Sequence, residues 1–465
     1  MWQIILTMMI LGFVWYLFPS RNHIPETQYQ LSGSSPWQHP DNAYLEIRST
    51  DIRTTIQGCK DVLTSAWKEK DFARWGEQMT LLETRAGPNI RLAENFGIEN
   101  PFTTIDEEYH KDFKGKIAKT LKTSDEEWWR LWTLSKGIAH NHVAKQGSKT
   151  AIPLVSLVQS VVFKVVMLKF FPDDSRLDED AAIANITRLI NTIWMDSKSS
   201  QTLKSTPGML FTLKKILKRY LSLDSVTGNL AALKNNLAYV LPTADCETPR
   251  ESPLNIILPT YETLWRVVFN CTIEVLFRHE DRNSLWKACI KTLGQTLDSK
   301  EKVVFHADTE RRLSILDIVN ETVRLYPPTK RIYRWEQQED QHGTLNGYPE
   351  LCAADIEAVH RDDQVWGPDA LHFDPGRQSR YNAEERKRVK ESFMPFGFGS
   401  LSCPAKDFAP KMVGLIVAVL VTELEGRFDC VTELEEDRID GIEPLKAKRD
   451  SYDTLKLRKL GDSVS

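Results

Sequence analysis

The 465-residue sequence has little of what marks a nucleic-acid-binding, zinc-binding or disulfide-stabilised protein. Its 60 Lys and Arg residues are nearly balanced by 64 Asp and Glu residues, so a net charge of −4 gives no general cationic field, and we expect no nucleic-acid partner. Its seven cysteines stand singly without a CxxC pair, which argues against a zinc ribbon or a disulfide framework. No GxGxxG dinucleotide fingerprint is present either. These absences favour a large globular chain in a reducing compartment, in which one cysteine is chemically special.

The N-terminus differs from the rest of the chain because it is apolar and uncharged over residues 2–18. About 17 to 25 apolar residues are needed to cross a bilayer core as a helix. A cleaved signal peptide is the alternative, but no basic residue precedes the run and no small-residue cleavage site follows it. Arg21 comes just after the run, which places the rest of the chain on the cytosolic side. We predict a transmembrane anchor over residues 1–18, a polar linker over 19–51 and a single domain over 52–465.

One cysteine lies in a distinctive loop, residues 396–405, with the sequence FGFGSLSCPA. Two glycines allow the backbone to adopt positive φ and to approach a flat ligand closely, and a lone cysteine offers a thiolate. A glycine turn followed by a buried cysteine is the alternative. With Phe396, Gly399 and Cys403 at the matching spacing, and Gly397 between them, the loop resembles the haem-binding signature of the cytochrome P450 family. That resemblance implies that Cys403 is the proximal ligand of a haem iron.

A second constellation is the sequence ETVRLYPP that begins at Glu321. Glu321 and Arg324 share a helix face, and the two prolines stop the helix. Alone, such a pair is a common surface salt bridge worth less than about 1 kcal/mol. It resembles the family's ExxR helix end, and the later segment FDPGR, which ends at Arg377, resembles the segment that adds a second arginine. The resemblance implies a buried triad of Glu321, Arg324 and Arg377 beneath the haem loop.

A long helical pattern over residues 256–278 matches the family's helix above the distal face of the haem, where an acid and an alcohol stand together. Glu262 and Thr263 match that pair, and the resemblance implies that they deliver protons during oxygen activation. Pro259 and Thr260 occupy the positions where the family usually has a small residue and a glycine. Because proline removes a helical hydrogen bond, we expect the helix to kink or to start late there. An ordinary capped helix is the alternative.

Candidate partners for the haem propionates are basic residues on two other elements. Arg334 lies in an alternating strand over residues 330–334, and the resemblance implies that it meets a propionate. Arg130 and Lys136 lie on a Trp-rich helix that begins near residue 125, although the usual spacing of tryptophan and arginine is imperfect, and a solvated basic face is the alternative. Leu401 stands where the family usually has a further basic residue.

Two segments raise questions of secondary structure. Residues 80–107 are punctuated by Gly, Pro and Asn, which predicts a long functional loop. Residues 153–171 form a second apolar run, but Gln159, Lys164 and Lys169 interrupt it, so we favour a buried or interfacial helix over a second membrane span.

Because these motifs occur in the family's order along nearly the whole chain, the resemblance implies the cytochrome P450 fold, mainly α with small β-sheets, behind a single N-terminal transmembrane helix. It implies a haem-thiolate monooxygenase that contains haem b and inserts one oxygen atom into a small hydrophobic organic substrate. The alternatives are a haem-thiolate isomerase or dehydratase, and a membrane-tethered haem-binding protein without turnover.

The resemblance also implies a location and a partner. It is closest to fungal microsomal forms, which implies a single-pass protein of the endoplasmic reticulum membrane with a cytosolic catalytic domain and a role in secondary metabolism. Electrons would come from NADPH through a separate flavin reductase. The charged run over residues 384–390 is either a solvated loop or a docking patch for an acidic electron donor.

Overall fold

The computed structural model describes residues 50–64, 80–146, 151–172, 179–198, 206–221, 248–279, 283–306, 313–336, 350–446 and 451–460. The chain divides into two units, Met1–Glu46 and Ile47–Ser465, and the described residues all belong to the second unit. The predicted transmembrane anchor over residues 1–18 lies outside the described residues. Within the described residues, no helix is both long and apolar enough to cross a membrane.

Helices dominate the described part of the chain. They are α2 (Ile56–Thr64), α3 (Leu81–Phe96), α4 (Glu107–Thr120), α5 (Asp125–Gln146), α6 (Leu154–Phe170), α7 (Asp180–Asp196), α8 (Thr206–Tyr220), α10 (Leu254–Leu276), α11 (Asn283–Asp298), α12 (Ile315–Leu325), α13 (Ile356–Arg361), α14 (Asp363–Trp366), α15 (Arg377–Arg380), α16 (Ala383–Ser392) and α17 (Ala409–Leu424). Short 3₁₀ turns are η2 (Pro249–Glu251), η3 (Gly399–Leu401) and η4 (Glu435–Asp437). The strands are β1 (Thr50–Arg53), β2 (Ile152–Pro153), β3 (Arg331–Glu336), β4 (Glu350–Asp355), β5 (Phe428–Val431) and β6 (Lys456–Lys459).

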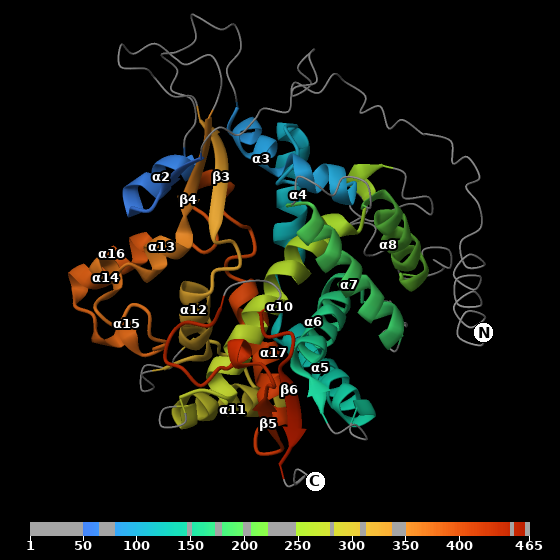
Figure 1. Ribbon diagram of the computed structural model, residues 1–465, viewed down its shortest axis with the longest axis vertical. Coiled ribbons are helices and arrows are strands. Elements are labelled where there is room, and N and C mark those ends of the chain that lie inside the picture. Colours follow the sequence, from blue (N-terminus) through green and yellow to red (C-terminus); the bar gives the residue numbers. More distant parts are fainter. Residues whose placement is uncertain are drawn as a thin grey trace, which may run out of the picture. The chain divides into compact units, whose positions relative to one another are not determined.

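Within the described residues the strands form two small sheets at separate places in Figure 1. The first has the order β1-β4-β3, with β1 parallel to β4 and β3 antiparallel to it, and the second has the order β2-β6-β5. Strand β1 begins at Thr50, so the predicted boundary between linker and domain at residue 52 falls inside a strand. That strand pairs with β4, about 300 residues later in the chain, and the composition around residue 50 gives no sign of such a long-range pairing.

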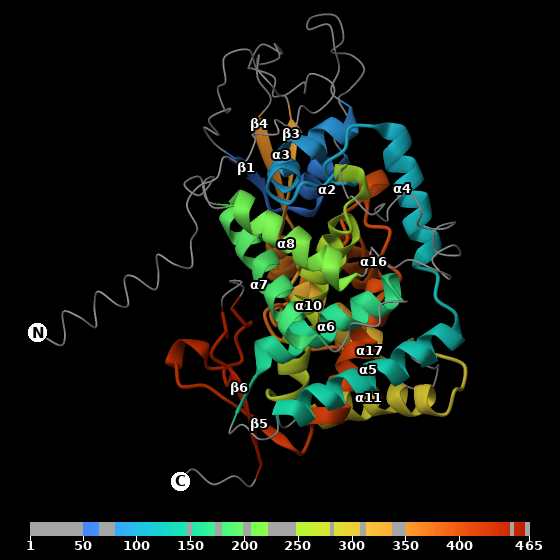
Figure 2. The same cartoon turned by 90° about the vertical axis from the view of Figure 1, so that its right-hand side faces the viewer.

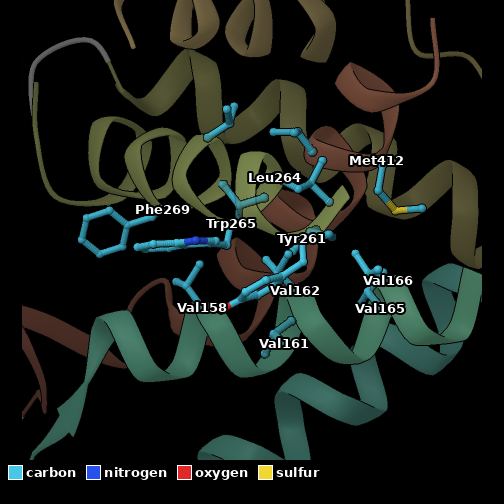
Figure 3. Close-up of a cluster of buried hydrophobic side chains, with 14 of the residues drawn as sticks. Val158, Val161, Val162, Val165, Val166, Tyr261, Leu264, Trp265, Phe269 and Met412 are labelled. Atoms are coloured by element: carbon cyan, nitrogen blue, oxygen red, sulfur yellow. The ribbon is translucent and has the colours of Figure 1, made fainter. Parts of the chain in front are cut away.

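Helix α10 is the centre of the hydrophobic core, and it contacts both α6 and α17. Figure 3 shows the aromatic side chains of Tyr261, Trp265 and Phe269 on the face of α10 that lies against the valines of α6. Tyr261 meets Phe163 of α6 edge to face, with ring centroids 5.5 Å apart. Met412 reaches the same cluster from α17. Because α17 begins shortly after Cys403, this packing ties the cysteine loop to the core.

Helix α6 is a buried core helix, as predicted for residues 153–171. Its two lysines are buried but paired, because the Lys164 ammonium lies 2.6 Å from Asp180 and the Lys169 ammonium lies 2.7 Å from Glu127. Burial lowers the pKa of Lys169, and Glu127 opposes that shift. A lysine within an apolar run therefore marks a specific ion pair in the protein interior rather than a lipid-facing helix.

The loop predicted over residues 80–107 is wrong over most of its length, because residues 81–96 form helix α3. A capping box opens the helix: the Thr80 hydroxyl accepts from the Glu83 backbone N–H, and the Glu83 carboxylate accepts from the Thr80 N–H. Gly97, at φ 59°, closes it. Pro88 is accommodated inside the helix. The capping residues Thr80 and Gly97 at the two ends of the helix therefore outweigh the turn-forming residues Gly87 and Pro88 between them.

Gly87 serves close packing rather than a turn. A Cβ atom at this position would lie 2.0 Å from Nε1 of Trp335, so only glycine allows α3 to approach strand β3 so closely. Figures 1 and 2 both show α3 beside the β1-β4-β3 sheet. This contact holds α3 against β3.

Candidate active site

The cysteine loop is a compact turn that leads into α17. The Cys403 backbone N–H donates to the Phe396 carbonyl at 2.8 Å, which closes the loop across seven residues. Gly397 and Gly399 have φ of 74° and 71°, as the sequence predicts. A Cβ at Gly399 would also lie 3.0 Å from Cγ2 of Thr64 at the end of α2. The two glycines thus fold the loop and seat it against α2.

The Cys403 thiol lies within this loop, and the Ala405 backbone N–H donates to its sulfur at 3.4 Å. Burial raises the pKa of Cys403, while the Ala405 N–H and the positive charges of Arg85 and Lys114 oppose that shift. Lys114, on α4, donates to the Ser400 carbonyl of the loop at 2.6 Å. Two cations from two helices therefore act on the sulfur and favour its thiolate.

Arg85 is buried near this sulfur and Arg334 is buried near Arg85, and neither has a carboxylate partner among the described residues. Arg85 on α3 is 7% exposed and lies over the Phe102 ring, 4.3 Å from its centroid. Arg334 on β3 is 4% exposed, donates to the Tyr333 carbonyl at 2.8 Å and leaves its Nε atom without a partner. Burial lowers the pKa of Arg85 to about 10, and burial together with the Arg85 charge lowers the pKa of Arg334 to about 9. Two buried like charges are costly unless an anion joins them.

The predicted triad is assembled as one buried ion-pair network. The Glu321 carboxylate accepts two hydrogen bonds from Arg324, both at 2.8 Å, and a third from Nε of Arg377 at 3.0 Å. The Asp374 backbone N–H adds a fourth, at 2.9 Å. The two arginines also donate to backbone carbonyls between residues 360 and 372. Every strong donor faces an acceptor, which is the condition for a buried ion pair to be tolerated.

His360 connects the triad to the cysteine loop. Its carbonyl accepts from Arg324 at 2.7 Å, and its ring Nε2 accepts from the Met394 backbone N–H at 3.0 Å, two residues before Phe396. The ring is fully buried and stacks on Phe393, with centroids 5.5 Å apart. Burial, with the Arg324 charge as a smaller cause, lowers the pKa of His360 to about 3. The neutral imidazole therefore fastens the start of the loop to the triad.

Helix α10 carries the predicted acid and alcohol. The Glu262 side chain is 4% exposed, whereas Thr263 and Thr260 are half-buried. The Thr263 hydroxyl donates to the Pro259 carbonyl at 2.8 Å, and the Thr260 hydroxyl donates to the Ile256 carbonyl at 2.6 Å. The helix begins at Leu254 and runs through Pro259, so it does not start late. Each hydroxyl oxygen keeps a lone pair with which it can accept a further proton donor.

Comparisons with known proteins bear on this arrangement. Residues 285–437 match the family model described as Cytochrome P450. Cytochrome P450 714A2 of Arabidopsis thaliana is 30% identical over 143 residues, which cover 30% of this chain and 27% of the relative. Cytochrome P450 734A5 of Oryza sativa subsp. japonica is 34% identical over 198 residues, which cover 42% of this chain and 36% of the relative. Over residues 285–437 the chain is thus similar to cytochromes P450.

Solved cytochrome P450 structures match far more of the chain than these sequence alignments do. Cytochrome P450SP alpha in complex with (R)-ibuprophen has a TM-score of 0.53 at 15% identity, covering 79% of this chain and 83% of the other. CYP154A1 from Streptomyces coelicolor A3(2) has a TM-score of 0.54 at 18% identity, covering 87% and 90%. These likenesses confirm the predicted fold, mainly α with small sheets. The match to the two curated relatives spans about a quarter to a third of their length.

The residues of this site fit the haem that the P450 family implies. Haem presents one iron to an axial thiolate and carries two carboxylates, and the structure offers a loop cysteine and two buried guanidiniums that lack carboxylate partners in the described chain. Arg334, which the sequence analysis named as a propionate partner, is one of these two guanidiniums, and its role stays a prediction.

Arg130 and Lys136, the other two propionate candidates, have partners elsewhere. Arg130 donates to the Leu168 carbonyl at 3.2 Å, and the Lys136 ammonium lies 2.7 Å from Asp298 on α11. Arg85 and Lys114, which do act on Cys403, were missed by the sequence analysis. The signal for Lys114 in the sequence is its spacing of four residues from His110 behind the Asp106 cap of α4, whereas the prediction rested on the tryptophans of α5.

We expect replacement of Glu321 by alanine to prevent haem incorporation and to cost about 3 to 5 kcal/mol of stability, because two buried arginines lose their carboxylate. Haem content and denaturant unfolding of the purified protein measure the two effects. Glu435→Ala is the control, because the Glu435 side chain is 83% exposed and pairs with Arg438 at the surface. A Glu321→Ala protein with a full complement of haem would contradict the role of the triad.

We expect stability to fall as the pH decreases from about 6.5 towards 3. The unfolded chain protonates His360 near its ordinary pKa, whereas the folded protein, in which its pKa is about 3, does not bind that proton. His360→Gln keeps an acceptor for the Met394 N–H and should flatten the decline, measured as unfolding free energy against pH. His140→Gln, at a largely exposed histidine, should leave the slope unchanged. Equal slopes for wild type and His360→Gln would refute this account.

Proposed function

We propose that this chain is a haem-thiolate monooxygenase that inserts one oxygen atom into a small hydrophobic organic substrate. The observation that carries the proposal is the Cys403 loop beside two buried guanidiniums that have no carboxylate partner among the described residues. Bound there, haem would supply reductive activation of dioxygen, with the thiolate donating electron density to the iron. A role in secondary metabolism and the fungal type belong to this proposal as expectations from the family resemblance.

The proximal residues have distinct tasks in this proposal. Cys403 would hold the haem iron through its thiolate, and Phe396, Gly397 and Gly399 shape the loop that presents it. The Ala405 N–H and the Lys114 charge stabilise the thiolate, which lowers the proton affinity of the sulfur. The triad and His360 hold the start of the loop through the hydrogen bond from the Met394 backbone N–H to His360. Buried ion pairs, and not the loop alone, therefore define the position of the sulfur.

The residues of α10 have the chemistry required to move protons. Glu262 is a buried carboxyl group, and Thr263 is a half-buried hydroxyl one residue away on the same helix. With its own hydrogen donated to the Pro259 carbonyl, the Thr263 oxygen accepts a hydrogen bond from an incoming water or substrate hydroxyl. Glu262 can then replace the proton that such a relay gives up.

A separate reductase that uses NADPH and flavin is the proposed electron donor. Four basic residues, Arg386, Lys387, Arg388 and Lys390, are exposed on α16, which ends four residues before Phe396. An acidic donor surface would be steered to this side of the loop, and its reduction rate should then fall with rising ionic strength. The membrane anchor over residues 1–18, with the catalytic domain on the cytosolic side of the endoplasmic reticulum, completes the proposal.

The carbon monoxide difference spectrum of the reduced protein tests the function most directly. We expect a strongly red-shifted Soret band in the wild type, because only a thiolate ligand produces that shift. Cys403→His should bind haem without the shifted band, and Cys430→Ser, which changes another free cysteine, should keep it. A wild-type protein that binds haem without the shifted band would refute thiolate ligation.

We expect Thr263→Ala to uncouple turnover, so that more NADPH and oxygen are consumed per molecule of product, on the order of tenfold or more for a lost proton-transfer group. The measurement compares product with NADPH and oxygen consumption in the presence of the reductase. Thr292→Ala is the control, since the exposed Thr292 hydroxyl also donates to its own helix, at 3.0 Å. Unchanged coupling would remove Thr263 from the mechanism, and product formation without oxygen consumption would favour an isomerase or dehydratase.

A further inference from the structure

The connection between α3 and α4 contains a turn that holds its own shape, and we call residues 99–106 the cover segment (Figure 2). It follows the end of α3, where Gly97 has a φ of 59°, and it leads directly into α4. The backbone N–H groups of Thr103 and Thr104 both donate to the Asn100 carbonyl at 2.9 Å. Because these hydrogen bonds lie within the segment, a displacement moves it as one unit.

The cover segment lies over a buried group of the candidate active site. The centroid of the Phe102 ring is 4.3 Å from the Arg85 guanidinium, and Arg85 is only 7% exposed. The Arg85 charge in turn acts on Cys403. Moving the cover segment away would therefore expose Arg85, and with it the surroundings of the cysteine.

Arg250, on the 3₁₀ turn η2, fastens the cover segment from the other side. Its guanidinium lies 2.7 Å from the Glu99 carboxylate and 3.0 Å from the Asp106 carboxylate. It also lies 4.3 Å from the ring centroid of Tyr109 in the first turn of α4. Next to it, the Glu99 backbone N–H donates to the Pro249 carbonyl at 3.2 Å. The cover segment, α4 and η2 thus meet at one guanidinium.

The turn η2 is itself fixed to the start of α10. The Asn255 side chain, which is 1% exposed, donates through Nδ2 to the Pro249 carbonyl at 2.8 Å and to the Arg250 carbonyl at 3.0 Å. Helix α10 is the core helix that also carries Thr263. Arg250 therefore joins the cover segment to the rigid core of the protein.

The ion pairs of Arg250 differ from those of the triad in their exposure to solvent. The side chains of Arg250, Glu99 and Asp106 are 42%, 28% and 40% exposed, whereas those of the triad are at most 4% exposed. Partly exposed ion pairs are weak and are screened by salt, and buried pairs are screened much less. The contacts that hold the cover segment can therefore open reversibly while the triad stays intact.

We propose that Arg250 is a latch: its ion pairs with Glu99 and Asp106 hold the cover segment closed over the Cys403 site, and their opening lets haem enter and leave. This inference rests on the proposed function. Salt weakens the latch, so the exchange of haem should accelerate as the ionic strength rises. The latch acts on the rate of exchange and not on the ligation, so the carbon monoxide difference spectrum of the loaded protein should not depend on it.

The first test measures haem transfer from the full-length loaded protein to excess apomyoglobin at rising salt concentration. We expect transfer from Arg250→Gln to be about threefold to tenfold faster than from the wild type at low salt, because two partly exposed ion pairs are lost. The two rates should converge at about 1 M salt, where the ion pairs of the wild type are screened. Arg250→Lys keeps the charge and should restore part of the difference.

Arg438→Gln is the matched control for the first test. Arg438 also pairs with two carboxylates, those of Glu435 and Asp440, at 2.9 and 2.6 Å, and its side chain is 52% exposed. These pairs lie within a single short stretch of chain and hold no other element. This variant should transfer haem at the wild-type rate at every salt concentration.

The second test is amide hydrogen exchange of the loaded protein, which detects how the cover segment moves. The Glu99 N–H crosses to Pro249, whereas the Thr103 and Thr104 N–H groups bond within the segment. In Arg250→Gln the Glu99 amide should exchange faster, and the Thr103 and Thr104 amides should keep their protection, because the segment moves as one unit.

Three outcomes would overturn the inference. Wild type and Arg250→Gln could transfer haem at equal rates at low salt. The Thr103 and Thr104 amides could lose protection together with Glu99, which would make Arg250 purely structural. A changed rate of substrate binding with unchanged haem transfer would assign the latch to the substrate. A wild type that takes up no haem would overturn the proposed function as well, whereas the first three results leave that function standing.

Discussion

The rest of the site depends on the buried ion pairs that the Glu321 carboxylate forms with Arg324 and Arg377. The carboxylate is buried and accepts hydrogen bonds from two arginines and one backbone N–H. Because Arg324 and Arg377 also bind the carbonyls of the segment that precedes the cysteine loop, one negative charge organises a long stretch of irregular chain. Such a pair contributes little net stability compared with an apolar core, so its value lies in holding one defined geometry.

Buried charges in the protein are of two opposite kinds, those with a carboxylate partner and those without one. In the triad, and at the two lysines of α6, each cation has a carboxylate within hydrogen-bonding distance. At Arg85 and Arg334 it has none in the described part of the chain. Paired charges stabilise the scaffold, whereas a buried charge without a partner is costly unless a ligand of opposite charge binds to it.

Prediction from the sequence succeeded where the chemistry depends on residues that are close together in the chain. The glycines of the cysteine loop adopt the expected positive φ, and the triad forms because Glu321 and Arg324 are one helical turn apart. It failed for residues 81–96, where the turn-forming Gly87 and Pro88 were given more weight than the capping box at Thr80. In the sequence, a glycine that leaves room for a neighbouring indole ring cannot be distinguished from a glycine in a turn.

The sequence by itself predicted the glycine conformations of the cysteine loop and the pairing of Glu321 with Arg324, because these depend on fixed spacings and on special backbone conformations. Only the tertiary structure decided which cations face the sulfur. Arg85 and Arg334 meet because a glycine of α3 packs on a tryptophan of β3 about 250 residues later, and no local pattern encodes such a contact. Arg130 and Lys136 matched the pattern better and yet have partners elsewhere, since the docking of each helix, not its sequence spacing, directs its side chains.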